Sequence, residues 1–311
     1  MRQVIRELVA PTALALGIAA IAEGRPGPEP PCPRRTAAFT VTVTGIGNRP
    51  MILIPGLLSS GQVWDGVVHH FSSRYRLHVL TIAGFAGVPP VGGALLPRVR
   101  DELIAYIRAN GLDQPVLVGH SLGGFLALWV ASTAPDAIGP VVLVDGVPFQ
   151  PALSDPAATA AGMEPLAERM RAMYRSMSPE QIGQQSGMAL ARMISDPARI
   201  ATVAAWAGRS DGGAVGQALY ELMTTDLREE VRKIRSDVLL VAAVKRVASM
   251  PERLGAALGA YEGQVAGVPR HQVVAAREAL HFVMLDDAPF LLASMDEFLA
   301  RAWSRPAAGE R

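Results

Sequence analysis

Cysteine, histidine and aromatic residues are scarce in this sequence. Its 311 residues include one cysteine, six histidines and 5% aromatic residues. The single cysteine, Cys32, cannot form an internal disulfide, and no Cys/His cluster has the spacing of metal ligands. The sequence therefore predicts no metal site.

A surplus of charge of either sign is also missing. The 29 basic residues nearly balance the 28 acidic ones, and no basic stripe is interleaved with aromatic side chains. This excludes nucleic acid as an expected partner. Half of the residues are hydrophobic, and a chain of this length fits one α/β domain with an insertion.

The N-terminus combines basic residues with an apolar run. Arg2 and Arg6 precede the apolar segment Leu8–Ala22, which ends in the small-x-small site Ala20-Ile21-Ala22. We expect residues 1–22 to be a signal peptide or an N-terminal anchor, and the protein to be exported, periplasmic or secreted. A simple N-terminal helix on a cytoplasmic protein is the alternative, and no other stable membrane partner is expected.

Beyond this segment the chain turns from a linker composition to a folded pattern. Residues 23–36 are rich in proline and glycine and predict a linker. From 37 onward, short apolar segments typical of buried strands alternate with helical stretches, which indicates a mostly parallel sheet covered by helices on both faces. Ligands of such sheets bind beyond the carboxyl ends of the strands. The expected strands are 39–44, 51–54, 77–82, a segment from 116, 141–144, 238–241 and 272–274.

The segment 148–235 interrupts this alternation, because it contains helical patterns and no strand candidate. We expect a core made of residues 37–147 and 236–311, with 148–235 inserted as a helical block. Flexible methionines in this block would suit an apolar substrate, or would simply pack the helices. They are Met163, Met170, Met173, Met177, Met188, Met193 and Met223.

A strand leads without a spacer into Gly119-His120-Ser121-Leu122-Gly123 and then into a helical stretch. This order predicts a nucleophile elbow, a sharp turn that strains the backbone of Ser121 and exposes its hydroxyl above the sheet. Side chains at Gly119 and Gly123 would collide across such a turn. Ser121 is therefore the candidate nucleophile.

A serine hydroxyl needs a base, most often a histidine held by a carboxylate. His281 alone lies in a loop just past the last expected strand, where the side chain can reach Ser121. The other histidines, which lie in an early helix, inside strands or within the elbow itself, are assigned structural or surface positions: His69, His70, His78, His120 and His271.

These motifs together resemble the α/β-hydrolase superfamily, in particular its capped esterase-like and epoxide-hydrolase-like members. The resemblance rests on Ile54-Pro55-Gly56-Leu57, on the elbow, and on His281–Asp286 followed by Pro289. It implies a mostly parallel eight-stranded sheet, a helical cap inserted after strand six, and the chain order nucleophile, acid, histidine. It also implies an oxyanion hole formed by the backbone N–H groups of Leu57 and Leu122.

The position of the carboxylate that would hold the histidine departs from the superfamily pattern. Relatives usually carry it after strand seven, where this chain has Arg246. Asp145, at the end of strand six, is the favoured replacement, because some superfamily members place the acid there. Glu252 is the first competitor. The remaining candidates are Glu278, Asp286 and Asp287.

The predicted reaction is two-step hydrolysis of a small-molecule carboxylic ester with an apolar part by Ser121, His281 and Asp145, without a cofactor. A cofactor-free perhydrolase or C–C hydrolase would use the same residues. A binding protein with a decayed site is the non-enzymatic alternative. A serine rather than an aspartate nucleophile argues against dehalogenase and epoxide hydrolase chemistry.

Overall fold

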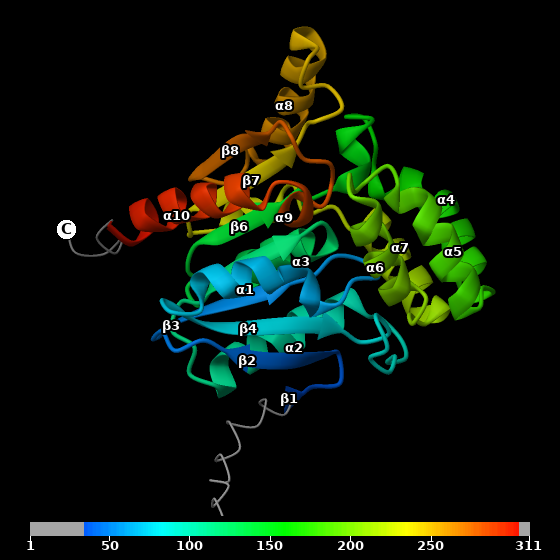
Figure 1. The fold of residues 1–311 in the computed structure, drawn as a ribbon, viewed down its shortest axis with the longest axis horizontal. Coiled ribbons are helices and arrows are strands. Elements are labelled where there is room, and N and C mark those ends of the chain that lie inside the picture. Colours follow the sequence, from blue (N-terminus) through cyan, green and yellow to red (C-terminus); the bar gives the residue numbers. More distant parts are fainter. Residues whose placement is uncertain (1–33, 305–311) are drawn as a thin grey trace, which may run out of the picture. The chain divides into compact units, whose positions relative to one another are not determined.

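The computed structural model describes residues 34–304 (Figure 1). The predicted signal or anchor at 1–22 and most of the predicted linker lie outside the described residues. The last part of the 23–36 linker is corrected, since Arg34 and Arg35 pair with Thr40 and Val41 of the neighbouring strand. This pairing uses backbone groups, so the side-chain pattern of the sequence did not reveal it.

One sheet forms the centre of the described chain, in the strand order β1-β2-β4-β3-β5-β6-β7-β8. The six strands from β4 to β8 in this order run parallel, whereas β1 and β2 are antiparallel to their neighbours. This confirms the predicted mostly parallel sheet. The strands are β1 Arg34–Arg35, β2 Phe39–Thr44, β3 Arg49–Ile54, β4 Tyr75–Ile82, β5 Val116–His120, β6 Val141–Val144, β7 Val238–Ala243 and β8 His271–Ala276.

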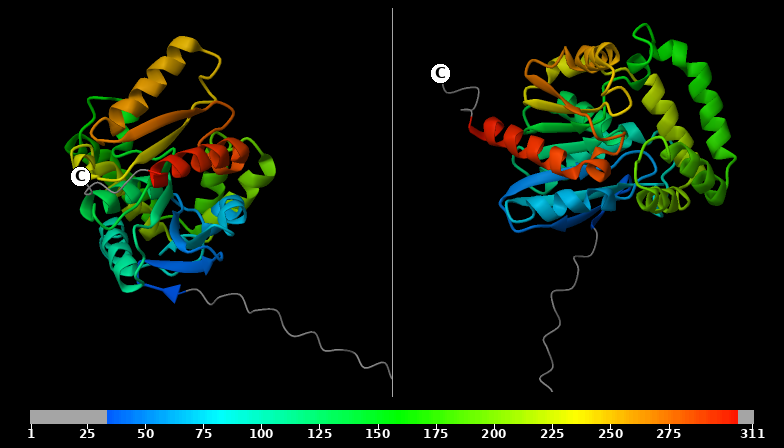
Figure 2. Two further views of the ribbon diagram at one scale, coloured as in Figure 1. Left: turned by 90° about the vertical axis from the view of Figure 1, so that its left-hand side faces the viewer. Right: turned by 45° about the horizontal axis from the view of Figure 1, so that its top comes forward.

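Helices cover both faces of the sheet (Figures 1 and 2). Helices α1 and α10 contact each other over one face, and α2 and α3 contact each other over the opposite face. The helices of the core are η1 Gly61–Trp64, α1 Asp65–Phe71, α2 Leu96–Ala109, α3 Leu122–Thr133, α8 Pro251–Val265, α9 Val283–Asp286 and α10 Ala288–Ser304. Among residues 34–304, no helix is long and apolar enough to span a membrane.

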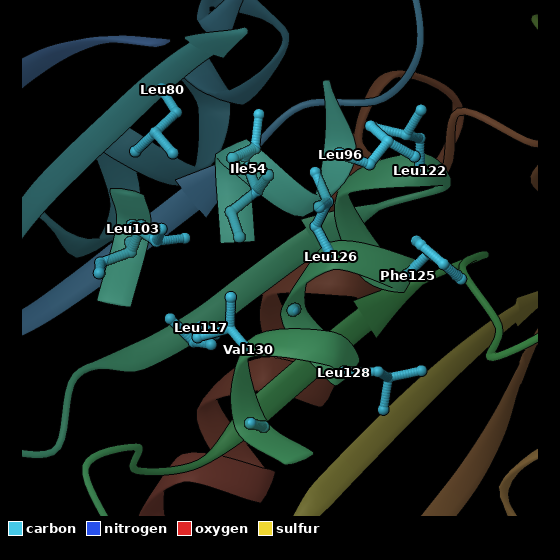
Figure 3. Close-up of a cluster of buried hydrophobic side chains, with 14 of the residues drawn as sticks. Ile54, Leu80, Leu96, Leu103, Leu117, Leu122, Phe125, Leu126, Leu128 and Val130 are labelled. Atoms are coloured by element: carbon cyan, nitrogen blue, oxygen red, sulfur yellow. The ribbon is translucent and has the colours of Figure 1, made fainter. Parts of the chain in front are cut away.

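Strand β3 shows how the sequence builds the two halves of the core. Met51 and Leu53 face the layer of α1 and α10, while Ile52 and Ile54 face α2 and α3. Figure 3 shows the buried cluster on the face covered by α2 and α3, in which Ile54 lies near Leu96 and Leu126. Alternate residues of a strand point to opposite faces, and each fully buried aliphatic side chain contributes about 1.5–3 kcal/mol.

The regular elements of the segment between β6 and β7 are all helices, and its described residues contain no strand. It comprises η2 Gln150–Leu153, α4 Ala160–Arg175, α5 Pro179–Leu190, α6 Pro197–Ala207, α7 Gly212–Thr224 and η3 Glu230–Lys233. We call α4 to α7 the helical block. In Figure 1 it lies beyond the carboxyl ends of the parallel strands.

The methionines of the helical block do not form one apolar wall. Met223 is buried, but Met188 is 73% exposed, and Met173 and Met193 are each 38% exposed. The substrate-facing role considered for this set therefore does not extend to those three. Helical spacing alone does not show which face of a helix in the insertion is buried and which is exposed.

Candidate active site

The turn from β5 into α3 places Ser121 in a strained conformation. Its φ is 52° and its ψ is −118°, a region that costs a non-glycine residue about 1–3 kcal/mol. A Cβ at Gly119 would lie 2.1 Å from the carbonyl oxygen of Gly123, and a Cβ at Gly123 would lie 2.2 Å from that of Ile54. Both contacts are with backbone, so only glycine permits the turn, as the motif predicts.

The loop after β3 lies directly against this turn. A Cβ at Gly56 would lie 3.3 Å from the Cβ of Ser121. Leu57 follows Gly56, and Leu122 is the first residue of α3, where backbone N–H groups have no partner within the helix. Within residues 34–304, neither of these two N–H groups meets a protein acceptor. Two backbone donors are thus available near Ser121.

The side chains of His281 and Asp145 are in hydrogen-bond contact beyond the carboxyl ends of the strands. His281 Nδ1 lies 2.5 Å from Asp145 Oδ2. The Asp145 side chain is 9% exposed and that of His281 is 26% exposed. Asp145 directly follows β6 with a φ of 50°, and His281 lies in the loop between β8 and α9. The carboxyl ends of β6 and β8, which lie on either side of β7, therefore bring the two side chains together.

No hydrogen bond joins Ser121 to His281, although both residues are among those described. His120, the residue before Ser121, nevertheless contacts His281, with the ring centroids 4.6 Å apart. Catalytic hydrogen bonds in unliganded enzymes are often long and shorten when substrate binds. The arrangement therefore brings a hydroxyl, an imidazole and a carboxylate to one edge of the sheet.

His120 is buried beneath His281. Its Nε2 lies 3.1 Å from the carbonyl oxygen of His281, so this nitrogen carries the proton and donates. Burial, reinforced by the nearby imidazole of His281, lowers the pKa of His120 well below its ordinary value, although the bond to the carbonyl opposes this shift. His120 is thus a neutral contact of the loop that carries His281.

At the position after β7, where the acid of the superfamily is expected from the sequence, this chain carries Arg246. Arg246 donates a hydrogen bond to the carbonyl of Arg192, in the helical block. The competing carboxylates also lie elsewhere: Asp286 accepts from Ser195 and from the N–H of Leu280, and Glu252 is exposed in the first turn of α8. Glu278 is exposed, and Asp287 accepts from the N–H of Phe290. Asp145 is the carboxylate that contacts His281.

Two other histidines have structural partners. His78 Nδ1 lies 2.8 Å from the hydroxyl of Tyr106, and His70 pairs with Asp296. Both contacts fit the structural positions expected for these residues.

Tyr261 was not among the candidates from the sequence. Its hydroxyl donates to Asp145 Oδ1 across 2.5 Å, and the N–H of Ala243 donates to the same oxygen across 3.0 Å. Burial, followed by the negative charge of Asp145, raises the pKa of the Tyr261 phenol. A tyrosine within a helix has no local motif, so only the tertiary structure identifies it.

A family model described as the α/β hydrolase fold matches residues 49–196. The chain is 33% identical over 98 residues to a pimeloyl-[acyl-carrier protein] methyl ester esterase of Aliivibrio salmonicida, covering 32% of this chain and 36% of the relative. A protein of the same name from Aeromonas hydrophila is 32% identical over 113 residues, covering 35% and 43%. The matched part thus spans less than half the length of these relatives.

Solved structures are similar over most of the chain. A hydrolase from Pseudomonas aeruginosa superimposes with a TM-score of 0.69 and 18% identity, covering 84% of this chain and 94% of that one. The enol-lactonase of Burkholderia xenovorans has the same TM-score with 16% identity, covering 85% and 99%. The chain therefore has the α/β-hydrolase fold.

Proposed function

We propose that this α/β-hydrolase-fold protein is a serine hydrolase that cleaves carboxylic esters of small to medium apolar substrates. The observation that carries the proposal is the Asp145–His281 pair at the edge of the sheet where the strained Ser121 turn emerges. Ester chemistry is further supported by the relatives named methyl ester esterases. A small methyl ester is therefore a natural first substrate to test.

In the first step, Ser121 Oγ attacks the ester carbonyl. Asp145 accepts from His281 Nδ1, which leaves Nε2 without a proton and able to take the one from the serine. The carbonyl oxygen becomes an oxyanion, and the N–H groups of Leu57 and Leu122 are the proposed donors to it. Each donor of this kind typically contributes about 10²–10³ in rate.

Departure of the alcohol then completes the acyl-enzyme, and water releases the acid in the second half of the reaction. His281, now protonated, gives its proton to the leaving alkoxide, and the alcohol departs from the acyl-enzyme. His281 then takes a proton from water as the water oxygen attacks the acyl carbonyl, and it returns that proton to Ser121 Oγ as the acid departs. Every step uses groups of this chain and water.

A series of p-nitrophenyl esters of increasing acyl length, together with simple methyl esters, tests this proposal. The wild-type protein should hydrolyse at least part of the series, and Ser121→Ala should lose the activity. Circular dichroism of the variant provides the control for folding. Hydrolysis that survives in Ser121→Ala would overturn the assignment of the nucleophile.

A further inference from the structure

Tyr261 lies behind the acid, on the side away from the imidazole. We propose that Tyr261 is a positioning residue of the reaction, which holds the Asp145 carboxylate in the orientation that His281 requires. The inference rests on the proposed hydrolase function. It adds a fourth side chain to the set of Ser121, His281 and Asp145.

The geometry divides the two oxygens of Asp145 between separate partners. Oδ2 contacts His281 Nδ1, while Oδ1 accepts from the Tyr261 hydroxyl and from the N–H of Ala243. Rotation of the carboxylate about its Cβ–Cγ bond would break all three contacts at once. The donors on Oδ1 therefore fix the direction in which Oδ2 points.

The phenol is a donor in this contact. The Tyr261 side chain is partly buried, and the raised pKa of its phenol keeps it protonated over the working range of an esterase. A hydrogen bond from a neutral donor to a carboxylate is shorter and stronger than one between neutral groups. The 2.5 Å separation of the two oxygens is in the range of such bonds.

Tyr261 lies in the C-terminal part of helix α8, which also contacts the chain that follows β6. Gln264, three residues after Tyr261, is buried, and its Oε1 accepts from the N–H of Phe149 across 3.1 Å. Residues three apart on a helix share a face. The last turn of α8 thus contacts the chain after β6 at two points, Asp145 and Phe149.

The hydrogen bond from Tyr261 matters because Asp145 lies at an unusual place for the acid. Arg246 stands where relatives of this fold usually carry the acid, and Asp145 replaces it from β6. Without Tyr261, only the N–H of Ala243 would hold Oδ1 of a side chain that is 9% exposed. A buried carboxylate oxygen that lacks a donor is unfavourable, so loss of the Tyr261 hydroxyl would free the carboxylate to turn toward other partners.

A double-mutant cycle separates positioning from packing. Tyr261→Phe keeps the ring and removes the hydroxyl, and it should lower kcat for a p-nitrophenyl ester by about 10-fold with KM nearly unchanged. In the Asp145→Ala background the same change should have no further effect, because no carboxylate remains to be held. Tyr106→Phe is the matched control, since its hydroxyl contacts His78, away from the site.

Equal losses from Tyr261→Phe in both backgrounds would overturn the proposal, because they would indicate a purely structural role. An unchanged kcat in Tyr261→Phe would overturn it as well. Thermal unfolding of each variant shows that the comparison is between folded proteins.

A proton NMR spectrum tests the role of Tyr261 independently of ester hydrolysis. The Nδ1–H proton of an imidazole bonded to a carboxylate resonates far downfield, and this signal requires no substrate. We expect the His281 signal to shift or broaden in Tyr261→Phe and to stay unchanged in Tyr106→Phe. A wild type that hydrolyses no ester would refute the proposed function, whereas an unaltered downfield signal in Tyr261→Phe would refute the role of Tyr261.

Discussion

Asp145 and His281 are 136 residues apart in the chain, and their side chains meet with Oδ2 and Nδ1 separated by 2.5 Å. The contact lies at the carboxyl ends of the parallel strands, one residue after β6 and in the loop after β8. In the proposed mechanism this contact fixes the tautomer of His281 and leaves Nε2 free to take the proton of Ser121. The proposed chemistry depends on this pair.

Replacing the acid should therefore disable the base. Asp145→Asn keeps the size of the side chain but favours the wrong imidazole tautomer, and kcat should fall by about 10⁴, as in serine proteases. The measurement is the hydrolysis rate of a p-nitrophenyl ester. Glu252→Gln, at the exposed competing carboxylate, should retain wild-type activity. Near-normal turnover in Asp145→Asn would refute the assignment of the acid.

The elbow should not tolerate a side chain at Gly123. In Gly123→Ala the new Cβ would lie 2.2 Å from the backbone oxygen of Ile54, so β3 and the turn must separate. We expect loss of esterase activity and a lower melting temperature. Gly66→Ala is the matched control, because nothing lies within 4 Å of a Cβ there and alanine favours helix α1. A fully active Gly123→Ala protein would contradict the described turn.

Buried His120 should make the protein less stable in acid. Its pKa is well below the ordinary value in the folded state, whereas in the unfolded chain it titrates near 6.5. Below about pH 6.5 the unfolded chain therefore takes up a proton that the folded chain does not, and stability falls by up to about 1.4 kcal/mol per pH unit.

His120→Gln removes this titration while keeping an N–H donor for the carbonyl of His281. Urea unfolding at pH 7.5 and at pH 5.5 should show a smaller loss of stability in the variant than in the wild type. Equal losses in the two proteins would show that His120 is not held neutral.

Glu221 should anchor the helical block to the core. Its carboxylate, on α7, is buried and accepts from the N–H groups of Leu95 and Leu96 at the start of α2. A negative charge is favourable at a helix N-terminus. Glu221→Gln should lower the free energy of unfolding by about 1–3 kcal/mol. Urea unfolding measures this, and Glu168→Gln, on the surface of α4, should change it little.

The sequence indicated the parts of the site that have local motifs. Ser121 is marked by its glycines and His281 by its place after the last strand, and both positions follow from the alternation of strands and helices. Asp145 could be assigned only by asking which other strand end could supply a carboxylate, because Arg246 occupies the usual position of the acid. The structure agrees in placing Asp145 against His281.

The rest of the site depends on tertiary contacts that no local pattern records. Helix α8 was not expected between β7 and β8, and Tyr261 reaches Asp145 only because that helix returns to the sheet at its end. The contact between His120 and the carbonyl of His281 is likewise set by the packing of two distant loops. The exposed face of the helical block, which carries Met188, also follows from how its helices stack.

Labelling with a fluorophosphonate probe, followed by mass spectrometry of the digested protein, tests the central claim most directly. The probe reacts with a serine only when a base activates it, so it reports the assembled site without knowledge of the natural substrate. We expect one adduct on the wild type, located on the peptide that contains Ser121, and none on Ser121→Ala. A folded wild-type protein that takes up no probe, or that carries the adduct on another residue, would contradict the account.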